Sequence, residues 1–170
     1  MSLTNRETWT LIHGMIIGSL FLLAFAGGLA GLYSLRPEYV TSAGIKERLF
    51  RLKVGTTAMA GLAWLTVITG TWIVYPWYRE TAPTSAKSIL LSNPDTKDWH
   101  EFGMEWKEHI AWISPTLATV AAFLVVLYGP ALVRNKTLRT LVIVIFAGAF
   151  ATAAIAGVFG ALITKAAPVK

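Results

Sequence analysis

Four long stretches of the sequence contain no Asp, Glu, Lys or Arg, and they constrain the fold more than any other feature. Each is at least about 20 residues long, enough for an α-helix to cross the roughly 30 Å hydrocarbon core of a bilayer. Only 14% of the 170 residues are charged, against about 25% in soluble domains. We therefore predict an all-α integral membrane protein, a four-transmembrane-helix bundle forming a single domain over residues 1–170. Its spans are expected at 10–35, 54–75, 110–133 and 141–163.

The N-terminal apolar run predicts a retained first helix. It is much longer than the roughly 7–15 apolar residues of a signal peptide, and no small-residue cleavage site follows it. The chain contains no cysteine. Disulfides, thiolate metal sites, iron–sulfur clusters and covalently attached c-type haem are therefore excluded for the chain itself.

Basic residues are concentrated on one side of the predicted topology. The loops 36–53 and 134–140 share that side and hold eight basic and two acidic residues, which accounts for the whole net charge of +6. Short loops rich in Lys and Arg stay in the cytoplasm. Both termini and the long loop 76–109 should then face outward, in what we expect to be a bacterial inner membrane. This sidedness explains the basic excess without a nucleic-acid partner.

The outer loop ends in the polar and aromatic stretch DWHEFGMEWKEHIAW, residues 98–112. Trp99, Phe102 and Trp106 recur in it at helical spacing, with acidic residues between them. This pattern predicts a short amphipathic helical extension before the third span, over 98–109, whose aromatic side rests on the membrane or on a partner. Pro115 predicts a kink just inside the third span.

Two histidines lie at matching depths in the predicted bundle. His13 precedes Arg36 by 23 residues, and His109 precedes Arg134 by 25 residues, or about 35 and 38 Å of helix. Both imidazoles should lie near the outer edge of the membrane, on helices that run in the same direction. Histidines on facing helices are suitable axial ligands for a b-type haem. We expect His13 and His109 to be metal ligands of one haem, the alternative being two hydrated interfacial histidines.

Other residues near this level would complete a haem pocket. Two glycines would let a flat macrocycle approach the first helix, two cations would pair with propionates, and two tryptophans would form walls. Helix packing, snorkelling of the cations and anchoring of the tryptophans at the interface are alternative roles. These candidates are Gly14, Gly18, Arg79, Lys107, Trp72 and Trp112.

His100 fits the same site less well. On a straight helix it would lie on the face opposite His109 and about 13–14 Å farther out. With Met104 it offers a two-ligand copper pattern, which is a common coincidence. No glutamate lies three residues before His100 or His109, as a di-iron carboxylate bundle would need. The absence of charges from the spans and of paired broken helices argues against a transporter.

The four spans and two depth-matched histidines resemble the four-helix membrane b-type cytochromes and haem-binding anchor subunits. The resemblance implies a non-catalytic electron-transfer subunit. It would relay electrons between quinol, or a partner such as a peripheral outer cytochrome, and a larger respiratory or photosynthetic complex. The second and fourth spans contain no histidine, whereas diheme members carry four histidine ligands, so the resemblance allows one outer haem. Trp72, Tyr75 and Pro76 could line a quinone pocket.

A second interpretation remains open. The chain would then be a haem-free accessory subunit of a membrane complex that docks a peripheral partner through residues 98–109. Small residues for helix packing and a patterned outer extension suit both interpretations.

Overall fold

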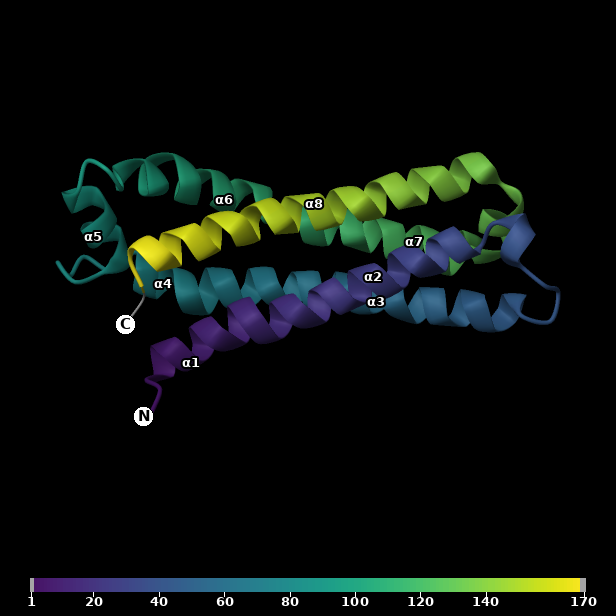
Figure 1. Ribbon diagram of the computed structural model, residues 1–170, viewed down its shortest axis with the longest axis horizontal. Coiled ribbons are helices and arrows are strands. Elements are labelled where there is room, and N and C mark those ends of the chain that lie inside the picture. Colours follow the sequence, from purple (N-terminus) through teal and green to yellow (C-terminus); the bar gives the residue numbers. More distant parts are fainter. Residues whose placement is uncertain (1, 169–170) are drawn as a thin grey trace.

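The computed structural model describes residues 2–168, in which four long helical rods lie side by side and no strand occurs (Figure 1). Each rod is long and apolar enough to cross a membrane. We call them span one (Asn5–Ser34), span two (Ile45–Tyr78), span three (Trp99–Arg134) and span four (Lys136–Ala166). Both chain ends lie at one end of the bundle, here called end A, and the opposite end is end B. The predicted all-α four-helix bundle is confirmed.

The spans are built from shorter helical elements. Span one comprises α1 (Asn5–Leu11), the π-helical η1 (Ile12–Ile17) and α2 (Gly18–Ser34). Span two comprises α3 (Ile45–Thr69), the π-helical η3 (Gly70–Val74) and α4 (Tyr75–Tyr78). Span three comprises the π-helical η4 (Trp99–Met104), α6 (Glu105–Ile110) and α7 (Ile113–Arg134), and span four is α8 (Lys136–Ala166). The 3-10 helix η2 (Pro37–Tyr39) and α5 (Ala86–Ser92) lie in the two longer loops.

The spans are longer than a bilayer requires. They contain 30 to 36 residues, or about 45–54 Å of helix, against a hydrocarbon core of about 30 Å. Part of the excess over the predicted apolar runs lies at end B, where α3 and α8 begin before the predicted runs, and the larger part lies at end A, in α1, α4, η4, α6 and the last turn of α8. The predicted helical extension before the third span is therefore present.

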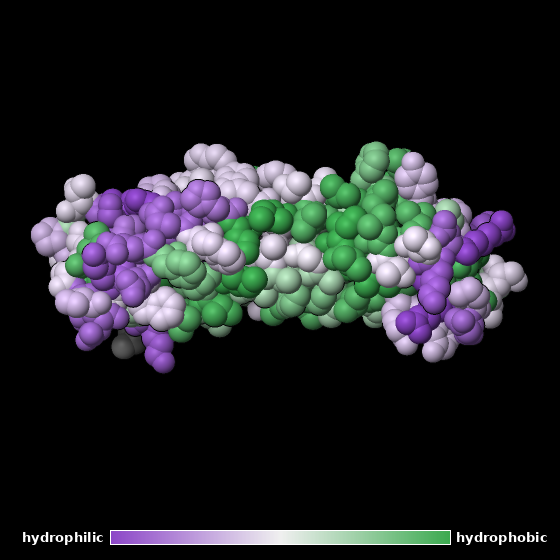
Figure 2. All heavy atoms as spheres, turned by 90° about the horizontal axis from the view of Figure 1, so that it is seen from above, coloured by the Kyte–Doolittle hydropathy of each residue, from purple (hydrophilic) through white to green (hydrophobic). Residues whose placement is uncertain are grey.

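On the face seen in Figure 2, a hydrophobic band covers the middle of the molecule and separates two hydrophilic ends. Large apolar side chains such as Leu23 and Val144 are exposed, at 71% and 61%. Exposed apolar surface of this extent is stable only in contact with lipid or other apolar helices. The chain is thus an integral membrane protein by the length and composition of its helices.

Small residues and aromatic rings form the core of the bundle. Ala118 and Ala121 on α7 are fully buried, which lets the neighbouring helices approach closely. Spans one and four meet through stacked rings: Phe25 lies 4.0 Å from Phe150 between centroids, and Phe21 lies 6.3 Å from the same ring.

Gly28 marks the tightest helix contact. A Cβ atom there would lie 2.5 Å from Cζ of Phe146, and one at Gly31 would lie 3.1 Å from Leu52. A Cβ atom at Gly27 would meet nothing within 4 Å. Of these three glycines, Gly28 and Gly31 therefore serve helix packing, and Gly27 does not.

Two prolines disturb span three in different ways. Pro115 has no N–H to donate to the carbonyl of Ala111, and the helix is interrupted between α6 and α7 at that point while the Ala111 backbone stays helical (φ −59°, ψ −32°). The stronger distortion is at Tyr128 (φ −109°, ψ 16°), two residues before Pro130. At the predicted kink near Pro115 the helix is interrupted but Ala111 and Trp112 keep helical dihedral angles, and the kink with non-helical angles lies instead at Tyr128, near end B.

Candidate functional site at end A

The π-helical segments gather at one end of the bundle. Within residues 2–168, η1, η3 and η4 are all at end A, on three different spans. π-helical turns are rare and often occur at functional sites. η1 contains His13, η4 contains His100, and η3 begins at Gly70, which faces His13. End A is therefore the candidate functional site.

His13 packs against span two. Its Nδ1 lies 2.9 Å from Oγ1 of Thr69, whose hydroxyl donates to the carbonyl of Leu65 at 2.8 Å. The Thr69 oxygen therefore accepts from Nδ1–H, and in the neutral imidazole Nε2 carries the lone pair. A Cβ atom at Gly70 would lie 3.0 Å from Cε1 and 3.4 Å from Nε2 of His13. The imidazole is thus seated on the backbone of η3, with no room for a macrocycle between them.

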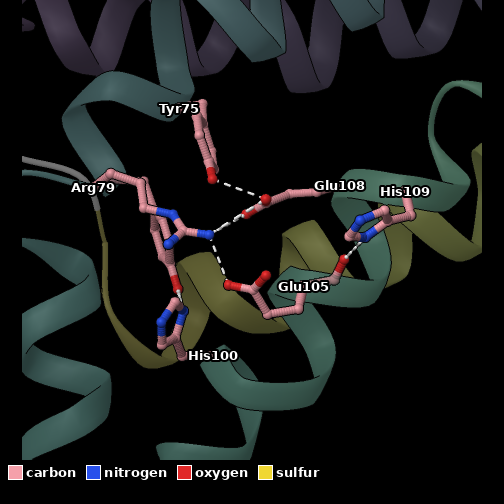
Figure 3. Close-up of polar contacts among 7 residues, drawn as sticks. Tyr75, Arg79, His100, Glu105, Glu108 and His109 are labelled. Carbon is pink, nitrogen blue, oxygen red and sulfur yellow. Dashed lines mark hydrogen bonds and ion pairs between the residues drawn. The ribbon is translucent and has the colours of Figure 1, made fainter.

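His109 lies on the outside of span three (Figure 3). Its Nδ1 is 2.6 Å from the backbone oxygen of Glu105. Because a carbonyl can only accept, Nδ1 donates this bond, and in the neutral imidazole Nε2 carries the lone pair. The ring borders an open surface groove of about 740 Å³, which we call the outer groove; it is lined by Glu101, Phe102, Glu105, Trp106, His109, Ile110 and Ile113.

The structure does not bring His13 and His109 together. The hydrogen bond of His13 is to span two, and that of His109 is to its own helix. The two histidines lie at similar depths along their spans, but they do not point toward each other about the helix axes. Lys107 points inward to span four, and two further residues turn the helix by about 200°, which directs His109 outward. A haem bridging the two imidazoles does not fit this arrangement.

An ion-pair cluster joins spans two and three at end A (Figure 3). Nη2 of Arg79 lies 2.6 Å from Glu105 and 3.0 Å from Glu108, and the Tyr75 hydroxyl donates to Glu108 at 2.8 Å. Burial acts against the charge of Arg79, but hydrogen bonds and attraction from Glu108 and Glu105 outweigh it, so the pKa of Arg79 is raised. Arg79, expected as a partner of propionates, is instead bound by carboxylates of its own chain, and Tyr75 is likewise engaged.

His100 is the buried histidine of the extension, at 7% exposure. Its Nδ1 lies 2.8 Å from the hydroxyl of Tyr78, which is also buried. This hydrogen bond fastens η4 to α4. Met104, on the same segment, is buried in an apolar cluster with Leu90 and Ile163. Within residues 2–168 there is no group of three or more His, Asp or Glu side chains placed to hold a metal ion.

The remaining candidates are two tryptophans and two glycines. Trp72 and Trp112 pack edge to face at 6.1 Å, and both rings are exposed, as suits residues that anchor a helix at the membrane interface. A Cβ atom at Gly14 or at Gly18 would meet nothing within 4 Å. Both glycines therefore face open space beside span one.

Lys107 extends into the bundle from α6. Its Nζ lies 3.3 Å from the position that a Cβ atom of Gly160 would occupy on α8. Sequence reasoning found Lys107 by its depth, but its inward direction depends on the rotation of α6.

End A therefore combines three features: an ion-pair cluster between spans two and three, a lysine that lies against span four, and an outward groove bordered by His109. No protein-family model, no curated protein and no solved structure matches the chain significantly.

Proposed function

We propose that this protein is a non-catalytic accessory subunit of a membrane complex, and that the outer groove docks a partner protein. The observation that carries the proposal is the composition of the groove. Two carboxylates, Glu101 and Glu105, lie beside aromatic and aliphatic side chains on one short stretch of helix. The bonds of Arg79 and Tyr78 to that stretch hold it against the bundle. Rigidly held surfaces of mixed polarity are typical of protein interfaces.

The order of residues along the groove indicates the partner's chemistry. Glu101 lies 12 residues before Ile113, about 18 Å along the helix, with Ile113 nearer the middle of the bilayer. The expected partner is an amphipathic helix with Lys or Arg facing the carboxylates and apolar residues facing Ile110 and Ile113. Within residues 2–168, Glu101 pairs only with the exposed Lys97, an interaction that a partner's cation can replace at little cost.

The distribution of charge supports an orientation for the subunit. End B carries the basic loops and faces the cytoplasm under the positive-inside rule. End A and the outer groove then face outward, toward the periplasm if the membrane is a bacterial inner membrane. The partner segment would approach from that side.

Site-directed photocrosslinking tests the docking function. The chain has no cysteine, so a photoreactive thiol reagent can be attached to Phe102→Cys alone. Phe123 is the matched control, with the same 60% exposure on the lipid-facing part of α7. In native membranes we expect one discrete protein adduct from position 102 that Glu101→Lys removes. Lipid adducts alone at position 102, as from a purely lipid-facing site, would contradict the proposal.

A second function is favoured by the geometry of His109. The hydrogen bond from Nδ1–H to the Glu105 carbonyl fixes the ring and leaves Nε2 free at the groove, as is usual for histidine ligands. His109 would hold the iron of one b-type haem from one side, and a partner subunit would supply the other ligand. The haem would supply one-electron transfer, and the subunit would act as an electron relay.

A reduced-minus-oxidised absorption spectrum of the intact complex tests this second function. A b-type haem band that is lost in His109→Ala but kept in His13→Ala would support it. Loss of the band in both variants would instead support ligation by both histidines. A complex without a haem band would contradict the relay and leave the docking function standing.

A further inference from the structure

End B contains a surface pocket that is separate from the outer groove. We call it the end B pocket; it has a volume of about 420 Å³ and lies between the start of α3 and the end of α7. Its lining residues are mostly apolar, with one cation and one amide among them: Ile45, Pro130, Ala131, Val133, Arg134 and Asn135. The volume is within the range of roughly 300–1,000 Å³ that is usual for small-ligand sites.

One face of α3 contacts α7 and continues into the pocket. Ile45, Leu49 and Lys53 follow one another at intervals of four residues, so they share a face of the helix. A Cβ atom at Gly129 on α7 would lie 3.4 Å from Leu49 and 3.6 Å from Cε of Lys53. The same face reaches the pocket at Ile45. The two helices therefore touch at Gly129 and leave the pocket open beyond it.

Three cations lie in or beside the pocket. Arg134 lines it, is exposed, and has no hydrogen bond or ion pair within residues 2–168. Lys53 packs its stem against α7 one residue before the first lining residue of that helix. Arg139 is only 8% exposed. Its Nη1 donates to the carbonyls of Leu132 and Val133 at 2.8 and 3.2 Å, which holds a third positive charge beside a residue that lines the pocket.

These charges have no acidic counterpart at the pocket. None of the residues that line it within residues 2–168 is acidic. The acidic residues of the end B loops are Glu38 and Glu47, and Glu47 pairs with Arg51. Arg51 precedes Lys53 by two residues, or about 200° around the helix, so this ion pair lies on another side of α3. Backbone carbonyls hold Arg139 but leave its net charge in place. The pocket is therefore suited to an anion.

The pocket lies at the depth of lipid headgroups. Its α7 residues, 130–135, extend past the end of the apolar run 110–133, and Ile45 precedes the apolar run 54–75. The headgroup region begins at such a boundary and is about 5–8 Å thick on each side of a bilayer. Phosphate is the anion that this region holds in quantity. Basic pockets between transmembrane helices are a recurrent type of binding site for anionic lipid headgroups.

We propose that the end B pocket binds the phosphate group of an anionic phospholipid. The phosphate accepts hydrogen bonds from Arg134, and Lys53 adds a second positive charge beside it. Ile45, Ala131 and Val133 contact the glycerol and the first methylene groups of the acyl chains. A free phosphate ion is the other source of the same chemistry. The site depends neither on the docking function nor on which side of the membrane end B faces.

Native mass spectrometry and thermal unfolding of the delipidated full-length protein in detergent test the proposal. The probes are phosphatidylglycerol, phosphatidylcholine and inorganic phosphate, each added alone. We expect phosphatidylglycerol to bind the wild type and to raise its unfolding temperature. Arg134→Met should weaken this binding by about tenfold or more, as expected for the loss of hydrogen bonds to a charged group. Arg51→Met removes the same charge from an exposed position of end B and should bind as the wild type does.

The outcomes separate the two sources. A shift with phosphatidylglycerol but not with inorganic phosphate identifies a lipid headgroup, and a shift with inorganic phosphate identifies a small-oxyanion site. Equal binding of phosphatidylglycerol and phosphatidylcholine would show that the acyl chains alone are recognised, and it would overturn the proposal. So would equal binding of phosphatidylglycerol by Arg134→Met and Arg51→Met, or no shift of the wild type with either phosphatidylglycerol or inorganic phosphate.

A second pair of variants covers a failure of Arg134→Met to fold. Ala131→Leu fills part of the pocket, whereas Ala161→Leu adds the same side chain to α8 at end A. Both alanines are exposed, so both positions can accommodate leucine. We expect weaker binding of phosphatidylglycerol by Ala131→Leu than by Ala161→Leu. Equal binding by these two variants would also overturn the site.

Discussion

Gly28 is the position at which the bundle leaves least room for a side chain. Its place on α2 lets the ring of Phe146 on α8 reach the backbone of span one. Close approach of this kind replaces the hydrophobic drive that helices lack in lipid. One glycine thereby determines how near spans one and four can lie.

We predict that Gly28→Ala destabilises the protein by about 1–3 kcal/mol, because the Phe146 ring must shift within a packed core. Gly27→Ala is the matched control, since its Cβ atom enters open space; it should be neutral or slightly stabilising through helix propensity. Chemical denaturation in detergent measures both. Equal stability of the two variants would contradict the packing described for Gly28.

Among the polar residues, Arg79 is the one that joins spans two and three, through its ion pairs with Glu105 and Glu108. We predict that Arg79→Met lowers the stability of end A by about 1–3 kcal/mol, because Glu105 and Glu108 lose their cation in a partly buried site. The control Arg51→Met removes an ion pair with Glu47 that is largely exposed at end B, and no measurable change is expected. The comparison requires unfolding curves of both variants. A similar, small effect for both would show that the cluster adds nothing to stability.

At the scale of helical elements, the sequence predicts that a helix is present better than it predicts which way the helix is turned about its own axis. Four uncharged runs predict four spans, because few structures other than a helix can bury that much backbone in lipid. The aromatic spacing of 98–109 likewise predicts the extension that η4 and α6 form. Both predictions use only the composition of a segment and the spacing of its apolar and aromatic residues.

The direction in which each side chain points depends on details that these patterns lack. His13 and His109 match in depth, but the rotation of α6 sends Lys107 inward and His109 outward. Each π-helical segment adds a further rotation of its own. The bond from His100 to Tyr78 joins residues 22 positions apart, across the loop that carries α5, and no local pattern indicates it.

The hydrogen bond between His100 and Tyr78 should hold η4 in place. We predict that Tyr78→Phe speeds amide hydrogen exchange across residues 99–110 by about tenfold or more, since losing a buried hydrogen bond costs about 1–3 kcal/mol. Tyr33→Phe, on an exposed ring at end B, is the control and should leave that segment unchanged. Hydrogen exchange with mass spectrometry provides the measurement. Unchanged exchange in Tyr78→Phe would mean that packing alone fixes η4.

At the scale of the whole molecule, charge divides the two ends. End B carries the basic loops, whereas acidic and basic residues balance at end A. The proposed orientation rests on the basic excess at end B, and the proposed docking site uses acidic side chains of the balanced end A. Both proposals therefore depend on the same distribution of charge.

Single cysteines test the orientation in intact cells. A membrane-impermeant thiol reagent is expected to label Lys165→Cys at end A and not Tyr39→Cys at end B, because the positive-inside rule places end B in the cytoplasm. Both positions are exposed, so access to the reagent depends on sidedness. Labelling of Tyr39→Cys and not of Lys165→Cys would show the opposite topology, with end B outside.

The central claim is that a partner protein covers the outer groove, and protection of one thiol tests it most directly. The labelling rate of Phe102→Cys by maleimide is compared in native membranes and in the isolated, detergent-solubilised protein, with Lys165→Cys as the control at the same end. We predict that position 102 reacts at least about tenfold more slowly in native membranes, as expected of a site uncovered less than about a tenth of the time, while position 165 keeps its rate. Equal rates at position 102 in both preparations would contradict the docking function.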